Sequence, residues 1–167
     1  MNISCREQQG FTLLEIIIVL AIVALLTGGG IHTWVDYQQA LRLEQNAQQL
    51  LDFFNRVQAN AYWHNQTRSA RLIQQGERWC MVSDVERQKG DEMCREENNR
   101  QYVRMTKDAS VAKATSNSFA FYGLRSTAQA GHMTLMSPAG KIRLVISARG
   151  RMRLCSEERP VLAIPLC

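Results

Sequence analysis

Residues 1–26 read MNISCREQQGFTLLEIIIVLAIVALL, and this stretch decides how the rest of the chain is interpreted. A polar segment of ten residues ends in Gly10, and a long apolar run that contains one acid, Glu15, follows it. From Ile16 to Val35 no residue is ionised when His32 is neutral. A helix of that length measures about 30 Å, which is the thickness of the hydrocarbon core of a bilayer. The sequence therefore predicts a membrane-spanning helix over residues 11–35.

The acid near the start of this apolar run needs an explanation. The run is longer than the apolar core of a secretory signal peptide, and no A-x-A cleavage site follows it, so a membrane anchor fits better. A carboxylate near the membrane costs a few kcal/mol unless it is shallow, protonated or paired. Glu15 is then either a shallow acid that local water tolerates, or half of an ion pair. No Lys or Arg lies within helical reach inside the membrane to complete such a pair.

Composition limits the function classes that need to be considered. The chain has 167 residues, for which one compact domain is the default, and a formal net charge of +5, which permits but does not require contact with nucleic acid or anionic lipid. It has no nucleophile elbow, no phosphate-binding glycine loop and no paired carboxylates. The three histidines lack the spacing of metal ligands. The sequence therefore predicts neither an enzyme nor a cofactor or metal site.

The segment that follows the apolar run has the pattern of a helix on a core. Apolar residues recur every three or four positions, which is typical of one buried helix face; they are Leu43, Ala47, Leu50, Phe54, Val57 and Ala61. Residues 36–65 are therefore expected to form the amphipathic half of one long N-terminal helix, from about Thr12 to about Trp63. Three glycines at 28–30 should interrupt that helix, since each costs about 1 kcal/mol against alanine.

From residue 66 to residue 167 the pattern changes to strands and turns. Hairpins are predicted over 69–83, with the turn at 74–76, and over 132–147, with the turn at 138–140. Further strands are expected near 118–124 and 147–155, and residues 84–100 are expected to form a polar loop. The predicted fold is α+β: a long N-terminal helix, membrane-spanning in its first half, packed on an antiparallel β-sheet or β-sandwich head.

The cysteine count indicates disulfide bonds in the head. Of five cysteines, four remain if residues 1–10 are removed or stay in the cytoplasm, and four cysteines in a small exported domain indicate two disulfides. A bond between Cys80 and Cys94 would close a loop of roughly 15 residues and contribute ~3 kcal/mol. A bond between Cys155 and Cys167 would hold a C-terminal tail that otherwise frays. The other connectivities remain open.

The segment QQGFTLLE at residues 8–15 resembles a type IV prepilin signal. The resemblance implies a leader peptide at residues 1–10, cleavage by prepilin peptidase after Gly10, and N-methylation of the new terminal residue Phe11. The amine of Phe11, on the same or a neighbouring subunit, would then pair with Glu15 and set the axial register between subunits. The leader departs from the family pattern, because Arg6 is its only base and Glu7 offsets it.

The head resembles the GspH/FimT group of minor pilins and pseudopilins through FAFYGLRSTAQAGHMTL, PAGKIRLVIS and SARGRMRLC. The resemblance implies a single-pass inner-membrane subunit with a periplasmic head that helps to initiate type IV pilus assembly and enters the pilus tip. The implied partners are prepilin peptidase, other minor pilins, the major pilin, the inner-membrane assembly platform and the membrane lipid. In such filaments a glycine-rich stretch such as 28–30 melts as subunits pack, while a simple hinge is the alternative. A pseudopilus of type II secretion remains an alternative client.

A nucleic-acid contact is the further alternative. Some FimT-like minor pilins use a C-terminal GRxR motif to capture DNA, and residues 150–153 read GRMR. The candidate phosphate contacts are Arg143, Arg149, Arg151 and Arg153. Arginines that alternate with Met152 and Leu154 are also what the solvated face of an amphipathic strand looks like, and they blunt a sheet edge against aggregation. The solvated face is the favoured interpretation, and nucleic acid is the less favoured partner.

Overall fold

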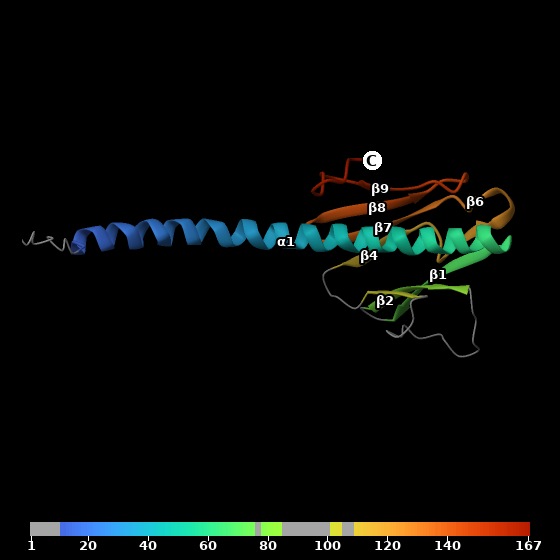
Figure 1. Ribbon diagram of the computed structural model, residues 1–167, viewed down its shortest axis with the longest axis horizontal. Coiled ribbons are helices and arrows are strands. Elements are labelled where there is room, and N and C mark those ends of the chain that lie inside the picture. Colours follow the sequence, from blue (N-terminus) through green and yellow to red (C-terminus); the bar gives the residue numbers. More distant parts are fainter. Residues whose placement is uncertain (1–10, 76–77, 85–100, 105–108) are drawn as a thin grey trace, which may run out of the picture. The chain divides into compact units, whose positions relative to one another are not determined.

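The computed structural model describes residues 11–75, 78–84, 101–104 and 109–167 (Figure 1). The chain divides into two compact units, Met1–Asp36 and Tyr37–Cys167, and each is described by itself. The second unit contains the sheets and is called the head below.

One α-helix, α1 (Leu13–His64), runs without a break through residues 28–30. The expected interruption at these three glycines is therefore wrong. Glycine lowers helix propensity, but unlike proline it keeps the N–H group that each turn of the helix needs. The helix ends where Asn65 adopts a left-handed backbone with φ of 50°. There the N–H of Gln66 donates to the carbonyl of Ala61 at 3.1 Å, which satisfies one of the last carbonyls.

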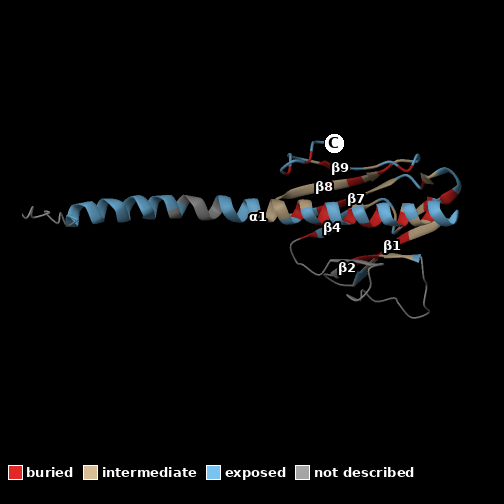
Figure 2. Ribbon diagram, viewed as in Figure 1, coloured by how far each residue is buried: buried red, intermediate tan, exposed pale blue. Residues whose placement is uncertain are grey.

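The predicted apolar stripe of α1 forms the centre of the head, as the sequence indicated. All six of its residues are buried, and Leu50 and Phe54 are fully so (Figure 2). The ring of Phe54 meets Phe119 and Phe121, with centroid distances of 5.5 and 5.9 Å. Phe119 and Phe121 are two apart on one strand, so both project from the same face of the sheet. The contact with Phe119 is edge-on and the contact with Phe121 is tilted. Aromatic contacts of this kind add to the stability that burial alone provides.

The strands of the head form two sheets, and all described strand pairs are antiparallel. The five-stranded sheet has the order β3-β2-β1-β5-β6, with β1 (Arg68–Gln75), β2 (Arg78–Ser83), β3 (Gln101–Arg104), β5 (Ser118–Tyr122) and β6 (Thr127–Ala128). The four-stranded sheet has the order β4-β7-β8-β9, with β4 (Ser110–Ala114), β7 (Gly131–Ser137), β8 (Gly140–Ile146) and β9 (Met152–Ser156). The expected α+β class and both predicted hairpins are confirmed. The turn predicted at 74–76 is misplaced, because Gln74 and Gln75 belong to β1 and pair with Trp79 and Arg78 of β2. The short 3-10 helix η2 (Gly123–Arg125) replaces the end of the strand expected to reach residue 124.

The C-terminal segment pairs with the edge strand β9, where Ser156 and Leu166 form a parallel bridge. Leu144 and Ile146 of β8 face the core, so Arg143 and its cross-strand partner Cys155 face outward. Cys155 forms a disulfide with Cys167. The N–H of Cys167 donates to the carbonyl of Ser156 at 2.9 Å. The predicted disulfide between Cys155 and Cys167 is therefore confirmed, and it holds the C-terminal tail.

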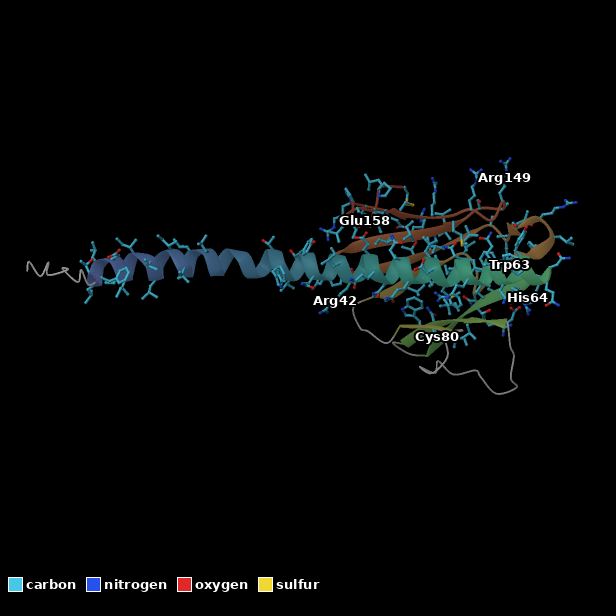
Figure 3. All side chains as sticks on the ribbon, in the orientation of Figure 1. Arg42, Trp63, His64, Cys80, Arg149 and Glu158 are labelled. Carbon is cyan, nitrogen blue, oxygen red and sulfur yellow. A yellow bond between two sulfur atoms is a disulfide. The ribbon has the colours of Figure 1, made fainter. Side chains whose placement is uncertain are left out.

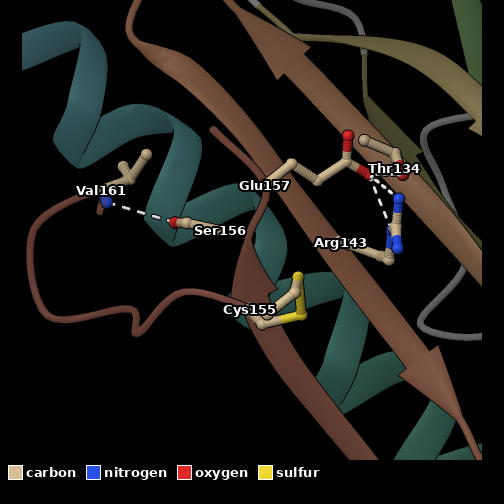
Figure 4. The surroundings of a disulfide bond; sticks show 7 residues. Thr134, Arg143, Cys155, Ser156, Glu157 and Val161 are labelled. Atoms are coloured by element: carbon tan, nitrogen blue, oxygen red, sulfur yellow. Dashed lines mark hydrogen bonds and ion pairs between the residues drawn. A yellow bond between two sulfur atoms is a disulfide. The ribbon is translucent and has the colours of Figure 1, made fainter. Parts of the chain in front are cut away.

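A partly buried ionic network secures the start of the same segment (Figure 4). One carboxylate oxygen of Glu157 accepts hydrogen bonds from the Thr134 hydroxyl at 2.8 Å and from Arg143 Nε at 2.7 Å. Arg143 Nη2 lies 2.6 Å from the same oxygen. Burial raises the pKa of Glu157, but the hydrogen bonds from Thr134 and Arg143 and the charge of Arg143 outweigh it, so its pKa lies below the ordinary value.

Removal of the C-terminal disulfide is expected to destabilise the head. The double substitution Cys155→Ser and Cys167→Ser opens a short loop, and the chain-entropy model puts the loss at about 2–3 kcal/mol. Urea unfolding of both proteins measures it. Leu166→Ser, at an exposed neighbour of Cys167, is the control and should change stability little. A double variant as stable as the parent would mean that the tail contributes nothing to the fold.

The head is also expected to lose stability in acid through Glu157. Because its pKa is lowered in the folded state, the carboxylate contributes its full stabilisation above the ordinary value of 4.5 and loses it as the pH falls through the folded value. The stability difference between the parent and Glu157→Gln should therefore narrow below about pH 4.5. Glu158→Gln, which removes an exposed carboxylate paired with Lys141, should show little difference at any pH. Unfolding curves over a pH series test both, and parallel curves for the parent and Glu157→Gln would contradict the assignment.

Candidate functional site

The first turn of α1 is organised by Thr12 and Glu15. The N–H of Glu15 donates to the carbonyl of Thr12 at 3.1 Å and to the Thr12 hydroxyl at 3.3 Å. Thr12 is therefore the N-cap, and Glu15 is the third residue of the helix, where a carboxylate interacts favourably with the helix dipole. The sequence analysis missed this role. The signal was present, because Thr-x-x-Glu ahead of an apolar run is the pattern of a capping box.

The residues of the predicted processing site fall on both sides of the described boundary. Gly10 and the rest of the predicted leader lie outside the described residues. Phe11 comes first among the described residues and is 81% exposed. Glu15 is also exposed. Phe11, whose amine is predicted to be methylated, and Glu15, predicted to pair with that amine, are thus both accessible.

Beyond Glu15 the apolar side chains of α1 are open to solvent. Eleven large aliphatic residues between positions 13 and 26 are 49% to 79% exposed. They are Leu13, Leu14, Ile16, Ile17, Ile18, Val19, Leu20, Ile22, Val23, Leu25 and Leu26. A contiguous apolar surface of this size is typical of a site that contacts a membrane or another protein. Within the part of the chain that the structure describes, no helix is both long and apolar enough to cross a membrane.

The four arginines that the sequence singled out are not equivalent in the structure. Arg143 lies on β8 and is bound to Glu157, as described above. Arg149, Arg151 and Arg153 are exposed, and Arg149 projects from the turn between β8 and β9 (Figure 3). Among the described residues, none of these three has an ion pair within 4 Å. A phosphate could therefore be met by three of the four, while Arg143 is already paired.

The glycine of the GRMR segment has a structural reason. Gly150 has a φ of 75°, which disfavours residues with a side chain. A Cβ there would lie 2.1 Å from the carbonyl oxygen of Ser126 and 2.4 Å from the amide nitrogen of Gln58. That amide donates to the Gly150 carbonyl at 2.9 Å. The glycine allows this turn to pack against α1 and the loop after η2, whether or not the arginines bind a ligand.

The remaining predicted residues are the other two cysteines. Cys80 is fully buried on β2 and is disulfide-bonded. Its predicted partner Cys94 lies outside the described residues. Among the residues that are described, no cluster of three or more His, Cys, Asp or Glu side chains is arranged to hold a metal ion.

Comparison with known proteins gives one match. Residues 5–31 match the family model of the prokaryotic N-terminal methylation motif. No curated protein and no solved structure matches the chain. The matched segment contains Gly10, Phe11 and Glu15 and ends within α1. It supports the type IV pilin or pseudopilin class for this chain and its processing by prepilin peptidase.

Proposed function

We propose that the chain is a minor pilin of the GspH/FimT group that helps to initiate type IV pilus assembly. The observation that carries the proposal is the methylation motif at residues 5–31, which leads directly into the exposed apolar surface of α1. The peptidase would cut after Gly10 and methylate Phe11. The product is a structural subunit and a substrate of enzymes rather than an enzyme.

The exposed apolar surface needs a cover both before and after assembly. Removal of apolar area from water is favourable by about 25 cal/mol per Å². Burial of the eleven exposed aliphatic side chains in lipid or against other helices would therefore stabilise the chain by many kcal/mol. Inner-membrane lipid provides that environment before assembly, with the head in the periplasm. Neighbouring helices provide it in a filament, where the same surface becomes part of a helix bundle.

Initiation is the step at which a specialised subunit has the largest effect. The first subunits of a filament lack neighbours on one side, so a nucleus buries less apolar surface per subunit than the mature filament does. A small set of minor pilins with matched heads forms that nucleus on the assembly platform and then accepts the major pilin. The attraction between apolar helices is non-directional, so the head is the part that selects these partners.

Two other functions would use the same apolar helix. A pseudopilus of type II secretion needs the same processing and the same bundle of helices. DNA uptake is favoured by one observation, which is that Arg149, Arg151 and Arg153 are exposed along one turn and strand. Such a contact would be weak, salt-sensitive and independent of sequence.

Deletion of the chain should abolish surface pili, and restoration of the intact chain should return them. Pili are counted by electron microscopy in the deleted, restored and parental strains. If pili persist at parental numbers in the deleted strain, the chain does not initiate their assembly. A mobility shift with double-stranded DNA at low and high salt, compared with an Arg149→Gln, Arg151→Gln and Arg153→Gln variant, then tests DNA capture.

Gly10→Val should leave the precursor uncut, because the peptidase is expected to need a small, flexible residue before the scissile bond. Mass spectrometry of the purified chain measures its N-terminus and any added methyl group. Gly28→Val is the matched control, since a Cβ at Gly28 meets no atom within 4 Å and the site is far from the cut in sequence. Mature-length product from Gly10→Val would refute the assigned cleavage site.

Glu15→Val should leave cleavage and membrane association intact but reduce piliation severalfold, because the Phe11 amine of a subunit then has no carboxylate to pair with. Thr12→Ala separates this role from capping. It removes the hydroxyl that bonds the Glu15 N–H but keeps the carboxylate, so piliation should stay near normal. Normal piliation by Glu15→Val would refute the pairing role, and equal loss in both variants would reduce Glu15 to a helix-capping residue.

A further inference from the structure

A second feature of the head, independent of the filament helix, is a groove on the outward face of the four-stranded sheet. The groove has a volume of about 530 Å³. Its lining includes His132 of β7, Arg143 of β8, Arg153 of β9 and the disulfide between Cys155 and Cys167. His132 is opposite Val145, and Val145 is opposite Arg153, so these three form one cross-strand row on the same face.

The imidazole of His132 is anchored through Nδ1. Thr115 Oγ1 accepts the backbone N–H of His132 at 3.1 Å and lies 2.8 Å from its ring Nδ1. The hydroxyl can donate to Nδ1 or accept from it, because its oxygen has two acceptor lone pairs. We assign the tautomer in which the hydroxyl donates to Nδ1 and the ring proton is on Nε2. In this tautomer β7 presents a ring N–H donor at the groove.

That donor has no acceptor among the described residues. Nε2 of His132 is buried and makes no hydrogen bond. A buried donor without a partner costs about 1–3 kcal/mol, so such a group points to an acceptor that the chain itself does not supply. Because Nε2 has less than 1 Å² of accessible surface, contact with a ligand also needs a side chain at the groove to rotate. Arg153, in the same cross-strand row as His132, is exposed.

The charge of the groove selects the class of acceptor. Arg143 and Arg153 contribute two positive charges, and Glu157, bound to Arg143, contributes one negative charge. The net charge of +1 matches a monoanion better than a phosphate dianion. Arginine also binds a planar carboxylate with two parallel N–H donors.

We infer that this groove is a binding site for a carboxylate, held by the guanidinium of Arg153 and the Nε2–H of His132, with Arg143 adding charge beside it. The natural source is an aspartate or glutamate side chain of a partner protein, or a free carboxylic acid of similar size. The site assigns Arg153 to a carboxylate rather than to DNA phosphates. It does not depend on which filament the chain serves.

The experiment is an NMR titration of the full chain in detergent micelles, with sodium acetate as the probe and sodium chloride at equal ionic strength as the reference. The imidazole signals of His132 should shift and saturate with acetate, while those of His64 should not. His64 is exposed, and its Nδ1 is 3.0 Å from the Asn60 carbonyl oxygen, so it serves as an internal reference. A capped aspartate that binds more tightly than acetate would indicate a protein side chain as the source, and equal affinities a free acid.

Two arginine variants separate the groove from general charge. Arg153→Gln should weaken acetate binding about tenfold, the effect of one charge-assisted hydrogen-bond donor. Arg149→Gln, an equal change of charge at an exposed residue outside the groove, should leave the affinity within about twofold. No shift at His132, or equal loss in both variants, would overturn the site. Tighter binding of inorganic phosphate than of acetate would overturn the carboxylate assignment.

Discussion

The packing of the second half of α1 against the two sheets is the interaction on which the rest of the head depends. Phe54 is fully buried and meets Phe119 and Phe121 of β5, so one side chain of the helix fixes the position of a strand from the middle of the sheet. β1 and β6 are both paired with β5. The four-stranded sheet contributes Leu135, Ile142 and Leu144 to the same core. The turn at Gly150 and the loop after η2 are then set by Gln58 of the same helix.

The two parts of α1 are under opposite constraints although they form one continuous helix. The part in the head has its apolar residues on one face, because the other face meets water. The part from Leu13 to Leu26 has exposed apolar residues all round, and such a helix is stable only when a membrane or other helices surround it. The same secondary structure therefore builds the core of the head in one place and presents an uncovered apolar surface in the other. The polar cap formed by Thr12 and Glu15 lies at the start of the exposed apolar part of the helix.

The parts of the fold that the sequence predicted are those with a strong period. The stripe from Leu43 to Ala61 has the period of a helix, and the hairpin over β7 and β8 has the period of a strand and a Pro-Ala-Gly turn. The break predicted at the glycines 28–30 does not occur, because helix propensity is a weaker effect than the hydrogen bonds of an established helix. β6 is two residues long, too short for any period to be recognised. The bond between Arg143 and Glu157 joins residues that only the register of β8 with β9 brings together.

The disulfide between Cys155 and Cys167 links the final form of the head to its chemical surroundings. Thiols of this kind stay reduced in a cytosol and become oxidised outside it. The pairing of the C-terminal residues with β9 is therefore fixed covalently only once the chain has met an oxidant. The covalent state of the tail therefore records whether the chain has left a reducing compartment.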